Sequence, residues 1–119
     1  MTRNSTIERR RALYEDAIAI IEREFARELE LDDVARRVAT SRRQLQRAFA
    51  ESAGTSFRTC LGEIRMRRAR ELLAEGSLPV RDVARRVGYR QPAQFAKAFR
   101  RRFGAPPSRF RSAGNTLAA

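Results

Sequence analysis

Three side chains that can donate hydrogen bonds share one face of a predicted helix. At about 100° per residue, Arg43, Gln46 and Arg47 lie together at spacing i, i+3, i+4. Arginine can donate two hydrogen bonds to guanine O6 and N7, and glutamine pairs in a similar bidentate way with adenine N6 and N7. A solvated face usually mixes both charge signs, whereas this one holds only donors. We therefore favour a face that reads base edges in a DNA groove over a plain solvated face.

The helix that carries these donors belongs to a unit that occurs twice. The pattern Asp-Val-Ala-Arg-Arg-Val stands at Asp33–Val38 and returns 49 residues later at Asp82–Val87. An Ala-Phe pair follows each copy, at Ala48-Phe49 and, 50 residues later, at Ala98-Phe99. Because the second spacing is one residue longer than the first, the turn of the second copy contains one extra residue. Each unit is predicted to be a helix, a tight turn and a second helix, which is the helix-turn-helix arrangement of DNA-binding proteins.

The second copy differs at the positions that would face a groove. Aligning Phe95 with Leu45 and Phe99 with Phe49 gives an exposed face of Ala93, Ala96, Lys97 and Arg100. Gln91, Pro92 and Gln94 lie at or near the start of this helix. Only Lys97 keeps the donor chemistry of its counterpart, Arg47. Alanines can pack on thymine methyl groups, so this helix either reads bases in that way or mainly holds the DNA backbone.

Helical periodicity dominates the chain and predicts an all-α fold. The first helix is expected from Thr6 to about Arg27, with an apolar stripe of Leu13, Ala17, Ile18, Ile21 and Phe25. This stripe is interpreted as core, with a dimerisation surface as the minor alternative. Further helices are expected at Leu31–Val38, Arg42–Ala53, Ser56–Glu75, Val80–Val87 and Pro92–Phe103, and a last short turn at Pro107–Arg111. Caps and stops support these bounds, namely Ser41, Gly54, Pro92, Gly76 and Gly104.

The Arg42–Ala53 helix has a second face opposite its donors. That face consists of Leu45, Ala48, Phe49 and Ser52. The Ser56–Glu75 helix places Phe57, Leu61, Ile64, Ala69, Leu72 and Leu73 near helical spacing. At ~1.5 Å per residue it spans roughly 30 Å, close to the ~34 Å between successive major grooves. Its Arg65, Arg67, Arg68 and Arg70 either touch phosphates or pair within the helix, as Arg67 with Glu71 or Glu63.

Composition narrows the possible functions. The 119 residues include 26 Lys and Arg against 14 Asp and Glu, a net charge of +12 that suits a polyanionic partner. The chain has no histidine and one cysteine, Cys60, which excludes a Cys/His zinc site, a Ser-His-Asp triad and an intrachain disulfide. Cys60 is interpreted as a small packed residue rather than a reactive thiol. No membrane span, secretion signal or cofactor site is expected, and the single thiol fits a reducing cytoplasm.

The two copies together resemble the DNA-binding domain of the AraC/XylS family of bacterial transcription regulators. The most specific match is the second copy, from Asp82 through Phe-Gly-x-x-Pro at Phe103–Pro107 to Phe110-Arg111, and the resemblance covers about Ile7 to Arg111. It implies seven helices in two helix-turn-helix subdomains joined by a long linker helix. It also implies recognition helices in adjacent major grooves, and usually activation through contact with RNA polymerase. The chain departs from the family's pattern around Gln91–Ala93 and at Ala39-Thr40, where a glycine is common.

Carried over by position, the resemblance gives a set of expected site residues. Base-reading residues would be Arg43, Gln46 and Arg47 in the first copy and Pro92, Ala93, Gln94, Ala96 and Lys97 in the second, with Gln94 and Lys97 the main candidates there. Contacts to the DNA backbone or at helix starts are expected from Ser41, Arg42, Gln91, Arg100 and Arg101. The expected organisation is a first subdomain at 6–54, a linker helix at 55–76, a second subdomain at 77–112 and a flexible tail at 113–119.

These observations predict a sequence-specific DNA-binding transcription regulator that acts as a monomer on an asymmetric site and is not an enzyme. The leading alternative is a basic architectural or RNA-binding protein without sequence preference, because phosphate contacts alone supply non-specific affinity. A DNA-alkyl transferase that uses Cys60 is a third possibility, which the absence of histidine disfavours. The length suits either a small stand-alone member of the family or the DNA-binding half of a larger regulator, and the polar leader after Met1 slightly favours a natural start.

Overall fold

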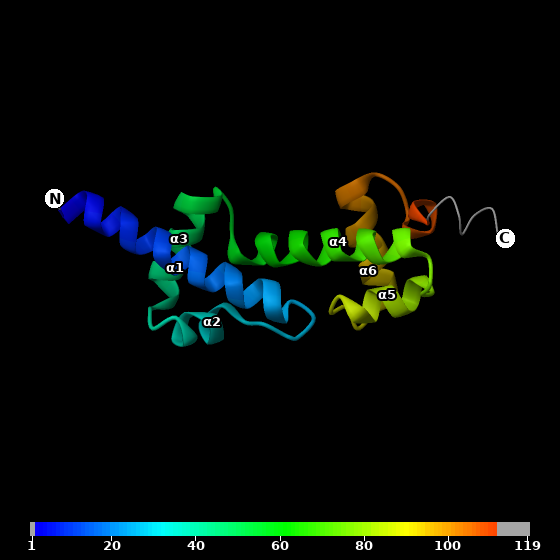
Figure 1. The fold of residues 1–119 in the computed structure, drawn as a ribbon, viewed down its shortest axis with the longest axis horizontal. Coiled ribbons are helices and arrows are strands. Elements are labelled where there is room, and N and C mark those ends of the chain that lie inside the picture. The colour runs from blue at the N-terminus through cyan, green and yellow to red at the C-terminus, as the bar shows by residue number, and fades with distance from the viewer. Residues whose placement is uncertain (1, 112–119) are drawn as a thin grey trace. The chain divides into compact units, whose positions relative to one another are not determined.

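The described part of the chain forms six α-helices, arranged as in Figure 1, and a short 3-10 helix in place of the expected seventh α-helix. The computed structural model describes the backbone of residues 2–111 and the side chains of residues 5–111. The elements are α1 (Thr2–Glu24), α2 (Leu31–Arg37), α3 (Arg42–Ala53), α4 (Phe57–Glu75), α5 (Val80–Arg86), α6 (Pro92–Phe103) and the 3-10 helix η1 (Pro107–Phe110). No strand occurs within this described part, and the predicted all-α class is confirmed. The tail expected at residues 113–119 lies outside the described residues.

Most helix bounds agree with the periodicity, and the differences have local causes. The first helix begins earlier than expected and ends at Glu24 rather than Arg27, because the chain turns there with a 2.9 Å hydrogen bond from the Arg27 N–H to the Glu24 carbonyl. The short helices α2 and α5 end one residue early. Val38 and Val87 act as their C-caps, with φ near −100° and ψ near 10°. The last turn is a 3-10 helix that ends at Phe110.

The chain divides into two compact units, residues 1–62 and residues 63–119, with the boundary inside α4. In the first unit, α1 lies against α3, and α2 contacts both (Figure 1). Its core is apolar: Ala17, Ile20, Ile21, Leu29, Val34, Ala35, Leu45, Ala48, Phe49, Phe57, Cys60 and Leu61. Ala17 and Ile21 of the predicted stripe are fully buried, whereas Leu13, Ile18 and Phe25 are only half-buried. The stripe is therefore core at Ala17 and Ile21 and only partly covered at its other three positions.

Phe49 of α3 is the centre of the aromatic packing in the first unit. Its ring meets those of Tyr14 and Phe57 edge-on, at centroid distances of 5.2 and 5.8 Å, a favoured geometry for aromatic pairs. Cys60 is buried beside this core, which supports its interpretation as a packed residue. Ser52, which lies on the same face of α3 as Leu45, Ala48 and Phe49, is exposed.

An ion pair links the end of α1 to α2. Arg37 donates two hydrogen bonds to the Glu24 carboxylate, at 2.8 and 2.6 Å. These bonds, with the nearby positive charge of Arg27 and Arg23, lower the pKa of the Glu24 carboxyl to about 2. The carboxylate therefore stays charged, and the pair is retained, down to well below the ordinary titration range of glutamate. This contact connects the end of α1 to α2, which in turn contacts α3.

The second unit has its own aromatic core. Phe95 and Phe99 of α6 are fully buried, together with Val83 and Val87. Phe99 contacts Phe95, Phe103 and Phe110 at centroid distances of 5.8, 4.6 and 5.1 Å. Phe110 comes from η1, so the family-like C-terminal signature completes the core under α6. No buried polar side chain is present in either unit within the described part of the chain.

The two turns have the same backbone hydrogen bonds although their sequences differ. The N–H groups of Ala39 and Gly88 each bond the carbonyl three residues back at 3.1 Å, and the next N–H in each turn bonds a carbonyl five residues back at 2.9 Å. Both residues are left-handed, with φ of 60° at Ala39 and 98° at Gly88. Glycine adopts this conformation freely, whereas a Cβ makes it unfavourable by roughly 1–2 kcal/mol. The first copy therefore carries local strain at the turn that aims α3.

Replacing Ala39 with glycine should stabilise the first unit. The substitution removes the left-handed strain, partly offset by the larger entropy of glycine in the unfolded chain, so we expect a gain of about 0.5–1 kcal/mol. Urea unfolding monitored by circular dichroism measures the change. Gly88→Ala is the matched control, and it should destabilise the second unit by a comparable amount. A loss of stability in Ala39→Gly would contradict the assignment of strain to this turn.

Candidate nucleic-acid interface

The donor face of α3 is exposed, and the opposite face of this helix is buried. Ser41 caps the helix by accepting a 3.1 Å hydrogen bond from the Gln44 N–H, as predicted. Leu45, Ala48 and Phe49 are 0% exposed, which fixes the rotation of the helix about its axis. Arg43, Gln46 and Arg47 consequently face solvent. Among the residues that the structure describes, none of these three has a hydrogen-bond or ion-pair partner.

Arg42, predicted to contact the DNA backbone, lies at the start of α3 and is engaged within the protein. Its Nη1 lies 3.0 Å from Asp32 Oδ1, and both side chains are about 60% exposed. An exposed pair of this kind contributes little to stability and can exchange for a phosphate contact. Asp32 and Asp33 also lie in the first turn of α2, where negative charge complements the helix dipole.

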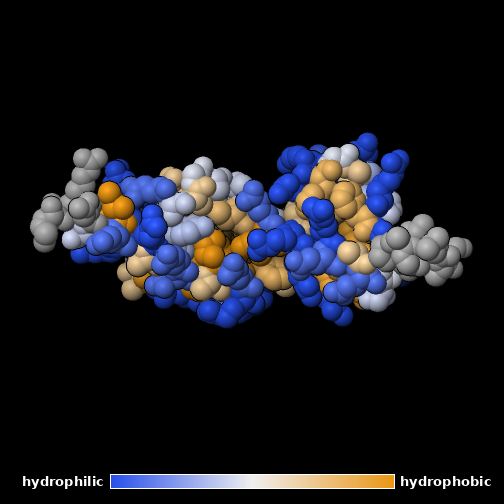
Figure 2. Space-filling view, turned by 45° about the horizontal axis from the view of Figure 1, so that its top comes forward, coloured by the Kyte–Doolittle hydropathy of each residue, from blue (hydrophilic) through white to orange (hydrophobic). Residues whose placement is uncertain are grey.

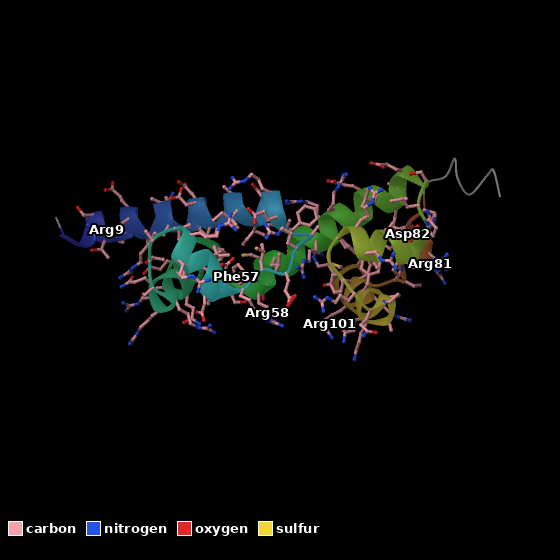
Figure 3. The ribbon with its side chains drawn as sticks, turned by 90° about the horizontal axis from the view of Figure 1, so that it is seen from below. Arg9, Phe57, Arg58, Arg81, Asp82 and Arg101 are labelled. Carbon is pink, nitrogen blue, oxygen red and sulfur yellow. The ribbon has the colours of Figure 1, made fainter. Side chains whose placement is uncertain are left out.

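The corresponding helix of the second unit presents a different surface. Gln91, Gln94, Lys97, Arg100 and Arg101 are all exposed, and Ala96 is half-buried. Gln91 is the N-cap residue but makes no capping hydrogen bond with its side chain, and Pro92 begins the helix. Arg101 lies among other basic side chains of this unit (Figure 3). The predicted site residues of α6 are therefore available for contacts, with cationic groups toward the helix end and few donors at its centre.

The arginines of α4 include one pair within the helix, as one alternative predicted, and two contacts that neither alternative included. Glu71 pairs with Arg68 at 3.0 Å rather than with Arg67. Arg65 lies over the ring of Tyr89 at 5.8 Å, and Arg70 lies 5.3 Å from Phe103 and 5.8 Å from Phe110. Such cation–π contacts attach α4 to the turn and aromatic core of the second unit. Sequence reasoning missed them because the aromatic partners are 24 or more residues away in the chain.

Positive charge is distributed very unevenly between the two units. Residues 1–62 contain 12 basic and 10 acidic residues, a net charge of +2, whereas residues 63–119 contain 14 and 4, a net charge of +10. Figure 2 shows hydrophilic residues around hydrophobic patches on the visible face of each unit. This difference in net charge can be counted from the sequence, but only after the boundary between the two units is known. The second unit therefore has the stronger attraction for a polyanion.

Two other kinds of site find no support in the described residues. Among them, no group of three or more His, Cys, Asp or Glu side chains is arranged to hold a metal ion. No helix of this part of the chain is long and apolar enough to cross a membrane.

Comparison with known proteins matches the geometry to one family. The family model described as "Helix-turn-helix domain" matches residues 34–113. The transcriptional regulator GlxA of Rhizobium meliloti is 38% identical over 112 residues, which cover 92% of this chain and 35% of that protein. A transcriptional regulator with an AraC-type DNA-binding domain from Chromobacterium violaceum superimposes with a TM-score of 0.80 at 30% identity, covering 84% of this chain and 89% of that one. The DNA-binding domain of AdpA, solved with a target DNA, gives 0.77 at 28% identity and covers 88% and 94%.

The chain belongs to the AraC-type helix-turn-helix family, whose members are bacterial transcription regulators and not enzymes. It spans about a third of the length of several curated relatives that it matches. The expected family membership is thus confirmed, and the enzyme alternative based on Cys60 is set aside.

Proposed function

We propose that this chain binds double-stranded DNA sequence-specifically and regulates transcription, with α3 as its principal reading helix. The observation that carries the proposal is the unpartnered face of Arg43, Gln46 and Arg47 on a helix whose opposite face is fully buried. A buried anchor holds these donors in one orientation, which lowers the entropy lost when they bind base edges. The AdpA domain, solved with a target DNA, supports the same role for this fold.

The second unit contributes mainly affinity in this proposal. Its net charge of +10 and the exposed Lys97, Arg100 and Arg101 suit phosphate contacts, which dominate sequence-independent binding. The alanines of α6 lack donors for base edges, so discrimination there is limited to Gln94, Lys97 and contacts with thymine methyl groups. We further propose that the 19-residue helix α4, about 28 Å long at ~1.5 Å per residue, links two helix-turn-helix subdomains for adjacent major grooves.

The remaining parts of the proposal follow from the family. The expected subdomains are residues 6–54 and 77–112, and one chain binds an asymmetric site without a partner copy. RNA polymerase is the proposed protein partner, activation the proposed outcome, and the cytoplasm the proposed location. The exposed donor set on α3 disfavours the alternative of a non-specific architectural or RNA-binding protein.

Selection of bound duplexes from a random DNA pool tests this proposal. We expect an asymmetric motif, with the strongest base preference in one half, and footprinting should show protection over roughly 20 base pairs on one side of the duplex. A selected pool without a motif would support the architectural alternative. Protection limited to a single groove would contradict binding by two helix-turn-helix subdomains.

A further inference from the structure

Next to its donor face, α3 carries an acidic residue, Glu51, whose carboxylate contacts a side chain of α1. Glu51 Oε2 forms an ion pair with Nη1 of Arg10, which lies 41 residues earlier in the chain. The Arg10 side chain is 17% exposed and that of Glu51 is 41% exposed. The pair is thus partly shielded from water, where charges attract each other more strongly than on an open surface. Both residues belong to the first unit, in which α1 packs against α3.

Arg10 is committed to this contact. Within the described part of the chain, Glu51 is its only ion-pair partner, and its Nε is buried without a hydrogen-bond partner. The guanidinium therefore lies between the two helices rather than at the surface that carries Arg43, Gln46 and Arg47. A direct contact between Arg10 and DNA is not part of the inference that follows.

Glu51 has one other cation within reach on its own helix. Residues four apart on a helix are neighbours, and Glu51 follows Arg47 by four positions, with Ala48 at the third. Arg47 is exposed and has no partner among the described side chains. An unengaged Glu51 would attract Arg47, and it would also place an uncompensated negative charge beside the proposed DNA surface.

We infer that Arg10 is a positioning residue for DNA binding. By neutralising Glu51 and holding it toward α1, it keeps Arg47 free for the groove. This inference rests on the proposed function of α3. It differs from a stability role for the ion pair, because it requires that the effect of losing Arg10 acts through the charge of Glu51.

A double-substitution cycle on the full chain tests the inference, with a duplex that carries the selected site as the probe. Arg10→Gln should weaken binding roughly two- to threefold, the size expected for one intrahelical ion pair that competes with the DNA. Glu51→Gln alone should bind as tightly as the unaltered chain or more tightly. In the Glu51→Gln background, Arg10→Gln should have no further effect. Arg10→Lys should bind nearly normally because a cation remains.

The matched control is Arg9→Gln, which removes the same charge from the exposed neighbour of Arg10 on α1 (Figure 3). An Arg10→Gln loss no larger than that of Arg9→Gln would overturn the inference. An Arg10→Gln loss that is equal with and without the Glu51→Gln substitution would overturn it too, because it would indicate a packing role, which melting temperatures would register. Arg47→Ala in the same assay separates the two proposals. If Arg47→Ala leaves sequence discrimination unchanged, the proposed role of α3 fails, whatever Arg10→Gln does.

Discussion

Phe99→Ala is expected to destabilise the second unit by about 3–5 kcal/mol, the usual cost of removing a fully buried aromatic ring. The Phe99 ring is 0% exposed and contacts three other phenylalanine rings, from α6 and from η1. The total stability of a small domain is often only about 5 kcal/mol, so this unit should be largely unfolded near 37 °C. Because the first unit has its own core, its amides should keep their protection.

Hydrogen exchange resolved by residue measures this outcome. Phe49→Ala is the reciprocal variant, since Phe49 is equally buried and contacts Tyr14 and Phe57 in the first unit. Phe103→Ala is a milder control, because that ring is only half-buried. If Phe99→Ala abolished protection in both units at once, the two cores would form one cooperative structure, contrary to the division of the chain.

Substituting the donors of α3 should change which sequences are bound. Arg43→Ala, Gln46→Ala and Arg47→Ala should each lower discrimination at one or two positions of the selected motif by about 1–3 kcal/mol per lost base contact. The reason is that alanine cannot form the bidentate hydrogen bonds that arginine or glutamine makes with a base edge. Competition binding with single-base variants of the selected duplex gives the preference at each position.

The matched controls come from α6 and should behave differently. Arg100→Ala and Arg101→Ala should weaken binding to all sequences about equally, and each should reduce the slope of log K against log salt by about 1. If the α3 variants lowered all affinities equally and left the motif unchanged, the architectural alternative would be favoured. If the α6 variants erased one half of the motif, the second unit would read more sequence than we propose.

The helices and their faces could be predicted well because their signals are local. The bounds of α3 and α6 follow from Ser41, Gly54, Pro92 and Gly104, and each of these residues acts within its own turn of backbone. Periodicity then separates Leu45 and Phe49 from Arg43 and Arg47, because a helix repeats every ~3.6 residues. The duplication located both units and the extra residue in the second turn.

Partners of charged side chains could not be predicted in the same way. For Glu71 the expected partner was Arg67 at the i,i+4 spacing, whereas Arg68 at the i,i+3 spacing of the same helix forms the pair. Arg70 contacts aromatic rings more than 30 residues later in the chain, and Arg10 forms an ion pair with Glu51 on another helix.

By itself, then, the sequence determined the all-α fold, the two related helix-turn-helix patterns, the exposed donors of α3 and the family. Each of these depends on residue types at short, fixed spacings, which backbone geometry converts directly into structure. Only the tertiary structure decided which arginines are free and which are engaged, that Ala39 is strained as Gly88 is not, and that the +12 charge divides into +2 and +10. The strain at Ala39 depends on the backbone conformation of its turn, and the other two properties depend on contacts between distant segments, for which the spacing of residues along the chain carries no rule.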